Sequence, residues 1–399
     1  DLRTALARLE ESRAQVQVSR SFLYPSVRLE PSALRQEFSA NRPNPAPIVL
    51  TSVTVNTFNL PVNVSYELDV WGRVRRSLES ASNDFQASAA DYESVRLSLT
   101  SEVARNYFLL RGLDTEQKIL ERTLAARKQS LDLVRSRVQA GIVTELDLRQ
   151  AETELATAES LLLDLQRSRT EYELTLSALC GFSASVFLVA ADTLRGLPAS
   201  LPVSVPSDML TQRPDVARAE FLMASANAQV GVSVGTLLPR VSLTASGGFQ
   251  SSDLSKLVSS DSRTWLIGVG VSVPLFEGFR NLSNISAAKS RYEQSLGQYR
   301  QTVLNAFKEV ETVLMNLKLR ASQSAVQARA VTAARQSAAL VRERYTKGLV
   351  NYLDVVNAER TALDAERQAT QILSQRLVYS VLLVKATGGG WNTSQLPTK

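Results

Sequence analysis

The side chains that most often do chemistry in proteins are scarce in this chain of 399 residues. Histidine is absent, which removes the commonest general base and the commonest metal ligand. The single cysteine, Cys180, allows neither an intrachain disulfide nor a thiolate metal cluster. Acid–base work would fall to Asp, Glu, Lys or Tyr, and these residues are spread along expected helix faces, not gathered at strand ends. We therefore expect no enzyme, no cofactor and no metal site.

Two carboxylates stand out, because Asp147 and Asp354 occupy the same place in a repeated passage. Residues 137–152 read RVQAGIVTELDLRQAE, and residues 344–359 read RYTKGLVNYLDVVNAE. Seven of the sixteen positions agree, and both passages contain a glycine that breaks a helical pattern. An acid early in a helix caps its N-terminus or offsets its dipole.

The repeat extends well beyond these two passages. A shift of 207 residues aligns the later part of the two copies, as in Tyr92 with Tyr299. A shift of 214 aligns the earlier part, as in Pro25 with Pro239. The change in shift predicts an insertion in the first copy, and the proline-rich NRPNPAP at 41–47 is the obvious place. We expect a tandem duplication, with structural repeats at 1–197 and 198–399.

Each copy is expected to contain one helix of about 65 residues, about 100 Å long at 1.5 Å per residue. No proline interrupts the chain between Pro61 and Pro198 or between Pro274 and Pro397. Shorter helices flank each long one, so each copy gives two helical columns and the chain gives four. The expected helices cover about 1–21, 73–140, 145–180, 214–234, 279–347 and 351–386.

Two β-hairpins are expected, at about 22–70 and 236–276. Apolar residues occupy every even position of 58–68 and every odd position of 265–273, and such alternation indicates strands with one apolar and one polar face. Four strands cannot close a barrel, but three chains would supply twelve, with the apolar face toward lipid and the polar face toward water. A soluble sheet packed on a helix is the alternative. Aromatic residues expected to form a girdle at one membrane interface are Phe22, Tyr24, Tyr66, Trp71, Phe276 and Phe279.

The charge balance argues against a nucleic-acid partner. The formal net charge of +6 is small for this length, and no block of five or more like charges occurs. Such a balance is typical of a solvated surface. No run of eighteen apolar residues is present, so we expect no membrane-spanning helix.

Six motifs, taken together and in this order, identify a family resemblance that spans nearly the whole chain. They are YELDVWGR at 66–73, GIVTELDLRQAE at 141–152, QRPDV at 212–216, SVPLF at 272–276, YTKGLVNYLDVVNAER at 345–360 and GGGWN at 388–392. The chain resembles the TolC-like outer-membrane efflux proteins. The closest resemblance is to the branch that exports drugs with proton-driven pumps of the resistance–nodulation–division type.

The resemblance implies an α+β membrane channel. It would be a homotrimer with a twelve-stranded β-barrel in the outer membrane, continuous with a twelve-helix α-barrel in the periplasm of a Gram-negative bacterium. An equatorial region would come from about 181–213 and the chain ends. The channel would passively conduct drugs and other small molecules, in contact with outer-membrane lipid. Its protein partners would be a periplasmic adaptor and an inner-membrane transporter. In many members of this branch a lipid anchor precedes the first helix, and we expect further residues before Asp1 here.

The resemblance also assigns roles to residues at the two helix turns. The turns would contact the adaptor through Gly141, Val143, Thr144, Gly348, Val350 and Asn351. The periplasmic aperture would be lined by Leu353, Asp354 and Asn357. Links that hold the closed tip would involve Asp147 and Tyr345. Some relatives carry an acid where this chain has Asn357 and a basic residue where it has Val350, so we expect a single ring of Asp354 carboxylates.

Two other functions remain open. A protein-secretion (type I) outlet would use the same tube, and export assays with the native adaptor and pump would separate it from a drug channel. A soluble coiled-coil scaffold would explain the helices but not the alternating strands at matching points of both copies. Detergent dependence and a heat-labile trimer on gels would favour the channel over the scaffold.

Overall fold

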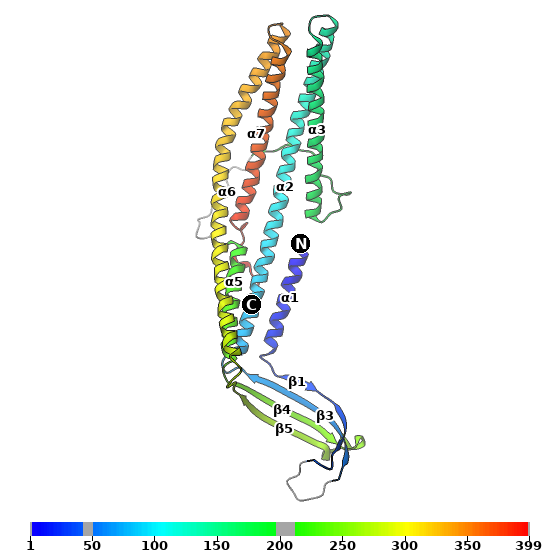
Figure 1. Ribbon diagram of the computed structural model, residues 1–399, viewed down its shortest axis with the longest axis vertical. Coiled ribbons are helices and arrows are strands. Elements are labelled where there is room, and N and C mark those ends of the chain that lie inside the picture. The colour runs from blue at the N-terminus through cyan, green and yellow to red at the C-terminus, as the bar shows by residue number, and fades with distance from the viewer. Residues whose placement is uncertain (1, 43–50, 197–211, 398–399) are drawn as a thin grey trace. The chain divides into compact units, whose positions relative to one another are not determined.

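The computed structural model describes residues 2–42, 51–196 and 212–397 (Figure 1). The expected insertion from residue 43 onward, the boundary between the two repeats and residues 197–211 of the 181–213 linker lie outside the described residues. The chain forms two compact units. The first comprises Asp1–Tyr92, Ala217–Thr302 and Leu396–Lys399, and the second comprises Glu93–Val216 and Val303–Gln395. Each unit therefore combines segments from both halves of the sequence.

Long uninterrupted helices dominate the described residues. They are α1 (Leu2–Ser21), α2 (Arg73–Gln139), α3 (Glu145–Cys180), α5 (Pro214–Gly235), α6 (Arg280–Thr346) and α7 (Tyr352–Ala386). Both α2 and α6 contain 67 residues, and their bounds lie within a residue of the ranges expected from the spacing of prolines. None of the described helices carries an apolar stretch sufficient to cross a membrane.

The first unit contains one antiparallel sheet. Its strands are β1 (Ser26–Leu29), β2 (Ser32–Phe38), β3 (Val53–Leu68), β4 (Arg240–Ser251) and β5 (Arg263–Ser272). The strand order is β1-β3-β4-β5, with β2 also paired to β3 (Figure 1). The two expected hairpins therefore join through β3 and β4 into a single sheet.

The first arm of the first hairpin consists of two strands, β1 and β2, where the sequence analysis expects one. Leu29 pairs with Val62 and Ser32 with Asn59, so the register is unchanged across the break. The break lies at Pro31, opposite the segment that contains Pro61, and neither proline has an N–H to donate to the ladder. The Glu30 N–H still donates to the Pro61 carbonyl over 3.2 Å.

The alternating residues gather on the faces that the sequence predicts. Tyr66 pairs with Leu243, and Leu243 pairs with Val269, so the three apolar side chains share one face across three strands. Along β5 this face is open to the surroundings, with Trp265 78%, Ile267 70% and Val271 64% exposed. A sheet that leaves its apolar face uncovered needs an apolar environment or a partner.

Helices of the first unit pack through small contact patches. Buried Val16 of α1 meets Ala81 and Phe85 of α2. α5 approaches the same part of α2 closely, since the Ser80 and Ser225 hydroxyl oxygens lie 2.9 Å apart.

In the second unit, α2 and α3 form one helical hairpin and α6 and α7 form another (Figure 1). The two hairpins contact each other, with α3 close to α7. A buried cluster from three helices joins them part-way along, comprising Ile119, Leu120, Leu165 and Leu363. A second cluster lies at the helix turns, where the predicted functional residues are found.

Candidate functional site

The two helix turns have the same backbone construction. Gly141 and Gly348 adopt φ of 72° and 73°, the left-handed conformation that glycine reaches without strain. The Gly141 N–H donates to the Val138 carbonyl and the Ile142 N–H donates to the Arg137 carbonyl, both over 2.9 Å. The Gly348 and Leu349 N–H groups make the equivalent bonds in the second turn, over 3.0 and 2.9 Å. Both helices thus end in a Schellman motif, which satisfies carbonyls that would otherwise lack partners.

Each turn is completed by a capping box at the start of the next helix. In the second turn, the Asp354 N–H donates to the Asn351 side-chain oxygen over 2.9 Å, and the Asn351 N–H donates to an Asp354 carboxylate oxygen over 3.3 Å. In the first, the Thr144 N–H and hydroxyl both donate to Asp147 Oδ2, over 3.1 and 2.9 Å. These contacts give both aspartates the capping role that the sequence analysis considers.

The expected aperture residues occupy one side of the first turns of α7. The exposed side chains here are Leu353, Asp354 and Asn357. The buried ones are their neighbours Tyr352, Val355 and Val356. This division places the three predicted pore-lining side chains together and away from the packed face. Their lining of a pore stays a prediction.

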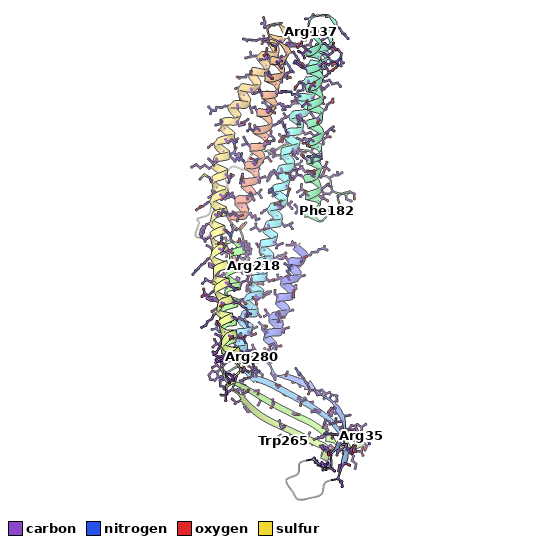
Figure 2. All side chains as sticks on the ribbon, in the orientation of Figure 1. Arg35, Arg137, Phe182, Arg218, Trp265 and Arg280 are labelled. Carbon is purple, nitrogen blue, oxygen red and sulfur yellow. The ribbon has the colours of Figure 1, made fainter. Side chains whose placement is uncertain are left out.

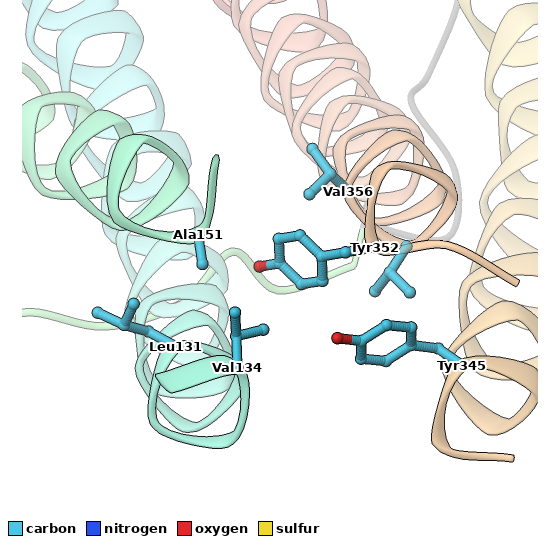
Figure 3. Packing of buried hydrophobic residues seen from close by; sticks show 7 residues of the cluster. Leu131, Val134, Ala151, Tyr345, Tyr352 and Val356 are labelled. Carbon is cyan, nitrogen blue, oxygen red and sulfur yellow. The ribbon is translucent and has the colours of Figure 1, made fainter. Parts of the chain in front are cut away.

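The packed face belongs to a group that we call the turn cluster. It draws on both hairpins and contains Leu131, Val134, Ala151, Tyr345, Tyr352, Val355 and Val356 (Figure 3). The Tyr345 and Tyr352 rings lie 5.6 Å apart, and Tyr352 reaches from α7 toward Ala151 of α3. Val143 and Val350, expected at the adaptor-contacting turns, are partly buried against this cluster. The other four residues expected there, Gly141, Thr144, Gly348 and Asn351, are exposed.

The expected gate residues Asp147 and Tyr345 do not meet through the tyrosine hydroxyl. Tyr345 is 6% exposed, and its hydroxyl has no hydrogen-bond partner among the described residues. The Asp147 carboxylate accepts from Thr144, within its own turn. A link from either residue that holds a closed tip stays a prediction.

Arg137 carries a role that the sequence analysis does not assign. Its guanidinium lies 4.8 Å from the Tyr345 ring centre and donates to the carbonyls of Tyr345 and Thr346, over 3.4 and 3.3 Å. A cation therefore caps the C-terminus of α6 from the end of α2, beside the turn that follows α2 (Figure 2). The only signal in the sequence is the match of Arg137 with Arg344 in the repeated passages.

The expected aromatic girdle lies in the first unit, where strands meet helices. Phe276 and Phe279 are 79% and 69% exposed, with their rings 6.0 Å apart in an edge-on arrangement. Phe22 and Tyr24 are exposed, and Tyr66 is partly exposed. Trp71, also exposed, donates its indole N–H to the Pro239 carbonyl over 2.8 Å. An apolar ring with a satisfied polar group suits a membrane interface.

Comparison with known proteins matches this arrangement to one family. The model of the outer membrane efflux protein family matches residues 1–182 and 205–389. The chain belongs to the outer membrane efflux protein family. This confirms the resemblance predicted from the six motifs. The protein is an outer-membrane efflux channel that extends into the periplasm.

The alignments with related proteins span almost the whole chain. The probable efflux pump outer membrane protein TtgC of Pseudomonas putida is 31% identical over 396 residues, which are 98% of this chain and 80% of the relative. The cation efflux system protein CusC of Escherichia coli O6:H1 is 30% identical over 394 residues, 98% of this chain and 83% of the relative.

Solved structures show the same fold. The outer-membrane channel OprN matches with a TM-score of 0.92 and 30% identity, over 98% of this chain and 87% of that one. The Campylobacter jejuni CmeC outer membrane channel matches with a TM-score of 0.93 and 27% identity, over 99% and 84% of the two chains.

Proposed function

We propose that this channel is the outer-membrane exit duct of a tripartite multidrug efflux pump, which passively conducts drugs and other small molecules out of the periplasm. The observation that carries the proposal is the uncovered apolar face of the sheet, on which Trp265, Ile267 and Val269 are 68–78% exposed. The opposite face of β5 carries one apolar side chain, Leu266, among Thr264, Gly268, Gly270 and Ser272. A sheet of this kind suits lipid on one side and a water-filled lumen on the other.

Three copies would close the sheet into a barrel. Among the described strands, β5 pairs only with β4, and β1 and β2 pair only with β3, so both edges of the sheet are open. Unpaired backbone groups at an edge are costly in lipid, and pairing of edges between copies removes them. With β1 and β2 counted as one arm, three copies give a twelve-stranded barrel. The aromatic girdle would lie at one interface of this barrel with the outer membrane.

The helices would form the periplasmic part of the same trimer. Along α6, Leu319, Val326 and Leu340 are 56–60% exposed and are spaced by multiples of seven residues. A heptad-spaced apolar stripe left open on a helix is suited to a coiled-coil partner. We assign this partner to a neighbouring copy, so that four helical columns per chain build a twelve-helix α-barrel.

The helix turns would then form the closed periplasmic mouth. The exposed side chains of Leu353, Asp354 and Asn357 would line the aperture, and an adaptor protein would dock on the turns and open it. Asp147 and Tyr345 would take part in the links that keep the mouth closed. Among the residues that the structure describes, the buried Tyr345 hydroxyl has no hydrogen-bond partner, which supports this role because an unsatisfied buried hydroxyl gains stability from a new bond.

Family membership supports the proposed partners. The proposed cargo can be tested most sharply. The relatives' names include a cation efflux protein, an antibiotic efflux protein and a toluene efflux protein. We assign a multidrug cargo, a periplasmic adaptor and an inner-membrane transporter of the resistance–nodulation–division type. The alternative within the same fold is an outlet for protein secretion.

The test is complementation. The full-length protein is expressed with its native adaptor and pump in a Gram-negative strain that lacks its own drug-efflux outer-membrane component. We expect restored resistance to several unrelated drugs, and a purified trimer that conducts ions in planar bilayers. Restored export of a secreted protein without drug resistance would favour the secretion outlet. A soluble protein that forms no trimer and no channel would contradict the proposal.

A further inference from the structure

A buried ion-pair group lies near the turn cluster and connects three helices of the second unit. Glu154 on α3 has a side chain that is only 6% exposed, and its carboxylate contacts Arg127 of α2 and Arg360 of α7. The group therefore joins the α2–α3 hairpin to the first helix turns of α7. Of its three members only Arg360 belongs to a turn motif, as the last residue of 345–360, and none of them is an expected aperture residue.

The two arginines are bound to Glu154 very differently. Arg127 is 5% exposed, lies 2.9 Å from Glu154 Oε2 through Nη2, and donates from Nη1 to the Glu154 carbonyl over 2.5 Å. Arg360 is 53% exposed and approaches the other carboxylate oxygen, Oε1. Arg127 is thus a fixed partner within its own hairpin, and Arg360 is a solvated partner that arrives from the other hairpin.

Other contacts of α7 lie near the turn and further along the helix. Close to the turn, Glu359 pairs with Arg342 of α6 over 2.8 Å, which holds α7 to its own hairpin. Contacts of α7 with α2 occur at the turn cluster, where Tyr352 packs with Leu131 and Val134, and again further along α7. There Arg367 pairs with Glu116 over 3.2 Å, and Ser374 donates to the Phe108 carbonyl over 3.2 Å. Arg360 is therefore the charged contact by which the beginning of α7 reaches α3. It lies about 12 Å from the start of the helix at 1.5 Å per residue.

We propose that Glu154 is the positioning residue of a latch that holds the beginning of α7 against α3 and that parts when the periplasmic mouth opens. This inference deepens the proposed function and rests on it. When α7 moves away with α6, Arg360 returns to water, where an exposed charge is easily hydrated. Glu154 keeps Arg127, so no buried charge is left without a partner, which would be the expensive outcome. The unequal exposure of the two arginines makes the contact reversible.

Hydrogen exchange in the full-length purified protein tests the latch without relying on conduction. R360Q removes the charge from α7 and leaves the Arg127–Glu154 pair intact, so the variant should fold. R167Q is the matched control, because Arg167 is 60% exposed and pairs with Asp164 and Glu171 of its own helix. We expect amides of 355–362 to exchange about two- to fivefold faster in R360Q than in the wild type, the range for an exposed pair. The control R167Q and the conservative variant R360K should match the wild type.

The outcomes separate the latch from the channel. Equal exchange rates in R360Q and R167Q would overturn the latch, whether or not the protein conducts ions. An R360K variant that exchanges as fast as R360Q would also overturn it. Faster exchange in R360Q, restored in R360K, supports it. The same variants are then recorded in planar bilayers. If three latches open together, conductance through the resting channel should rise by about tenfold or more, because the effects multiply. Faster exchange with wild-type conductance would leave the latch standing and contradict the proposed gating role of the helix turns.

Discussion

The carboxylate of Asp114 on α2 is fully enclosed, and its replacement by asparagine should strongly destabilise the second unit. Arg111 Nη1 lies 2.8 Å from Oδ2, and Arg169 Nε of α3 lies 2.8 Å from Oδ1. The Asp192 N–H, in the segment that follows α3, also donates to Oδ2 over 3.2 Å. One side chain thus holds α2, α3 and the following segment together.

The size of the destabilisation depends on which hydrogen-bond acceptors the two arginines keep in D114N. Removal of one partner from a buried ion pair costs about 3–5 kcal/mol. Arg111 and Arg169 are 11% and 17% exposed, and each keeps a second acceptor, the carbonyls of Ala190 and Val189. Partial hydration and these carbonyls place D114N at the lower end, about 3 kcal/mol. For a unit of this size we expect a fall in melting temperature of about 6–12 °C.

Thermal unfolding of the detergent-solubilised protein, followed by circular dichroism, measures the effect. The matched control is D164N, because Asp164 makes a pair of similar length with Arg167, 2.9 Å, but is 66% exposed. An exposed pair contributes about 1 kcal/mol or less, so the control should lower the midpoint by about 4 °C at most. If D114N melts no lower than D164N, the reasoning from burial is wrong.

Three further changes test other parts of the molecule. D354N should reduce cation selectivity, measured as a reversal potential across a salt gradient in bilayers. The control D132N removes an exposed carboxylate from α2 and should leave the reversal potential unchanged. An unchanged potential in D354N would contradict the ring of charges. R213K should lower the melting temperature by the equivalent of about 2–3 kcal/mol. Buried Arg213 uses its planar guanidinium to reach Asp215, Glu309 and the Ala386 carbonyl, and a lysine cannot reach all three. A lysine variant that melts like the wild type would refute this role of Arg213. Burial raises the pKa of Tyr352 above its usual value, so its stabilising contribution should be complete below about pH 10 and fall as the pH rises through the raised pKa. Melting temperatures should therefore fall more steeply above about pH 10 in the wild type than in Y352F, and equal slopes would count against the assignment.

Local sequence rules anticipate the elements of this fold because those elements depend on local physics. Proline-free stretches give α2 and α6 nearly to the residue, since a proline within either helix would remove a hydrogen bond. Gly141 and Gly348 end helices because only glycine reaches positive φ freely. The break at Pro31 was open to the same reasoning, since proline inside a strand has no N–H for the ladder.

Contacts between the hairpins could not be predicted in this way. Glu152 and Glu154 stand two residues apart on one helix, and nothing local distinguishes them. In the structure Glu152 pairs with Arg149 on an open surface, 2.9 Å away, whereas Glu154 is buried between α2 and α7. The difference arises from which face of α3 meets its neighbours. Arg137 is a similar case, because its acceptors lie 208 and 209 residues further along the chain.

The two similar passages contribute different side chains to the contact between the hairpins. The second copy supplies Tyr345 and Tyr352 to the turn cluster, where the matching positions of the first copy hold Val138 and Glu145. The first copy supplies Arg137, which caps α6 across this contact.

The backbone hydrogen bonds of each turn stay within its own hairpin, so the turns themselves are well fixed. The hairpins meet at this end through ring packing, a cation beside a tyrosine and a half-exposed arginine. When these contacts part, the Tyr345 carbonyl keeps its bond from the Gly348 N–H, and the carbonyl of exposed Thr346 can bind water. Opening should therefore occur between the hairpins, with each glycine turn moving as a rigid piece.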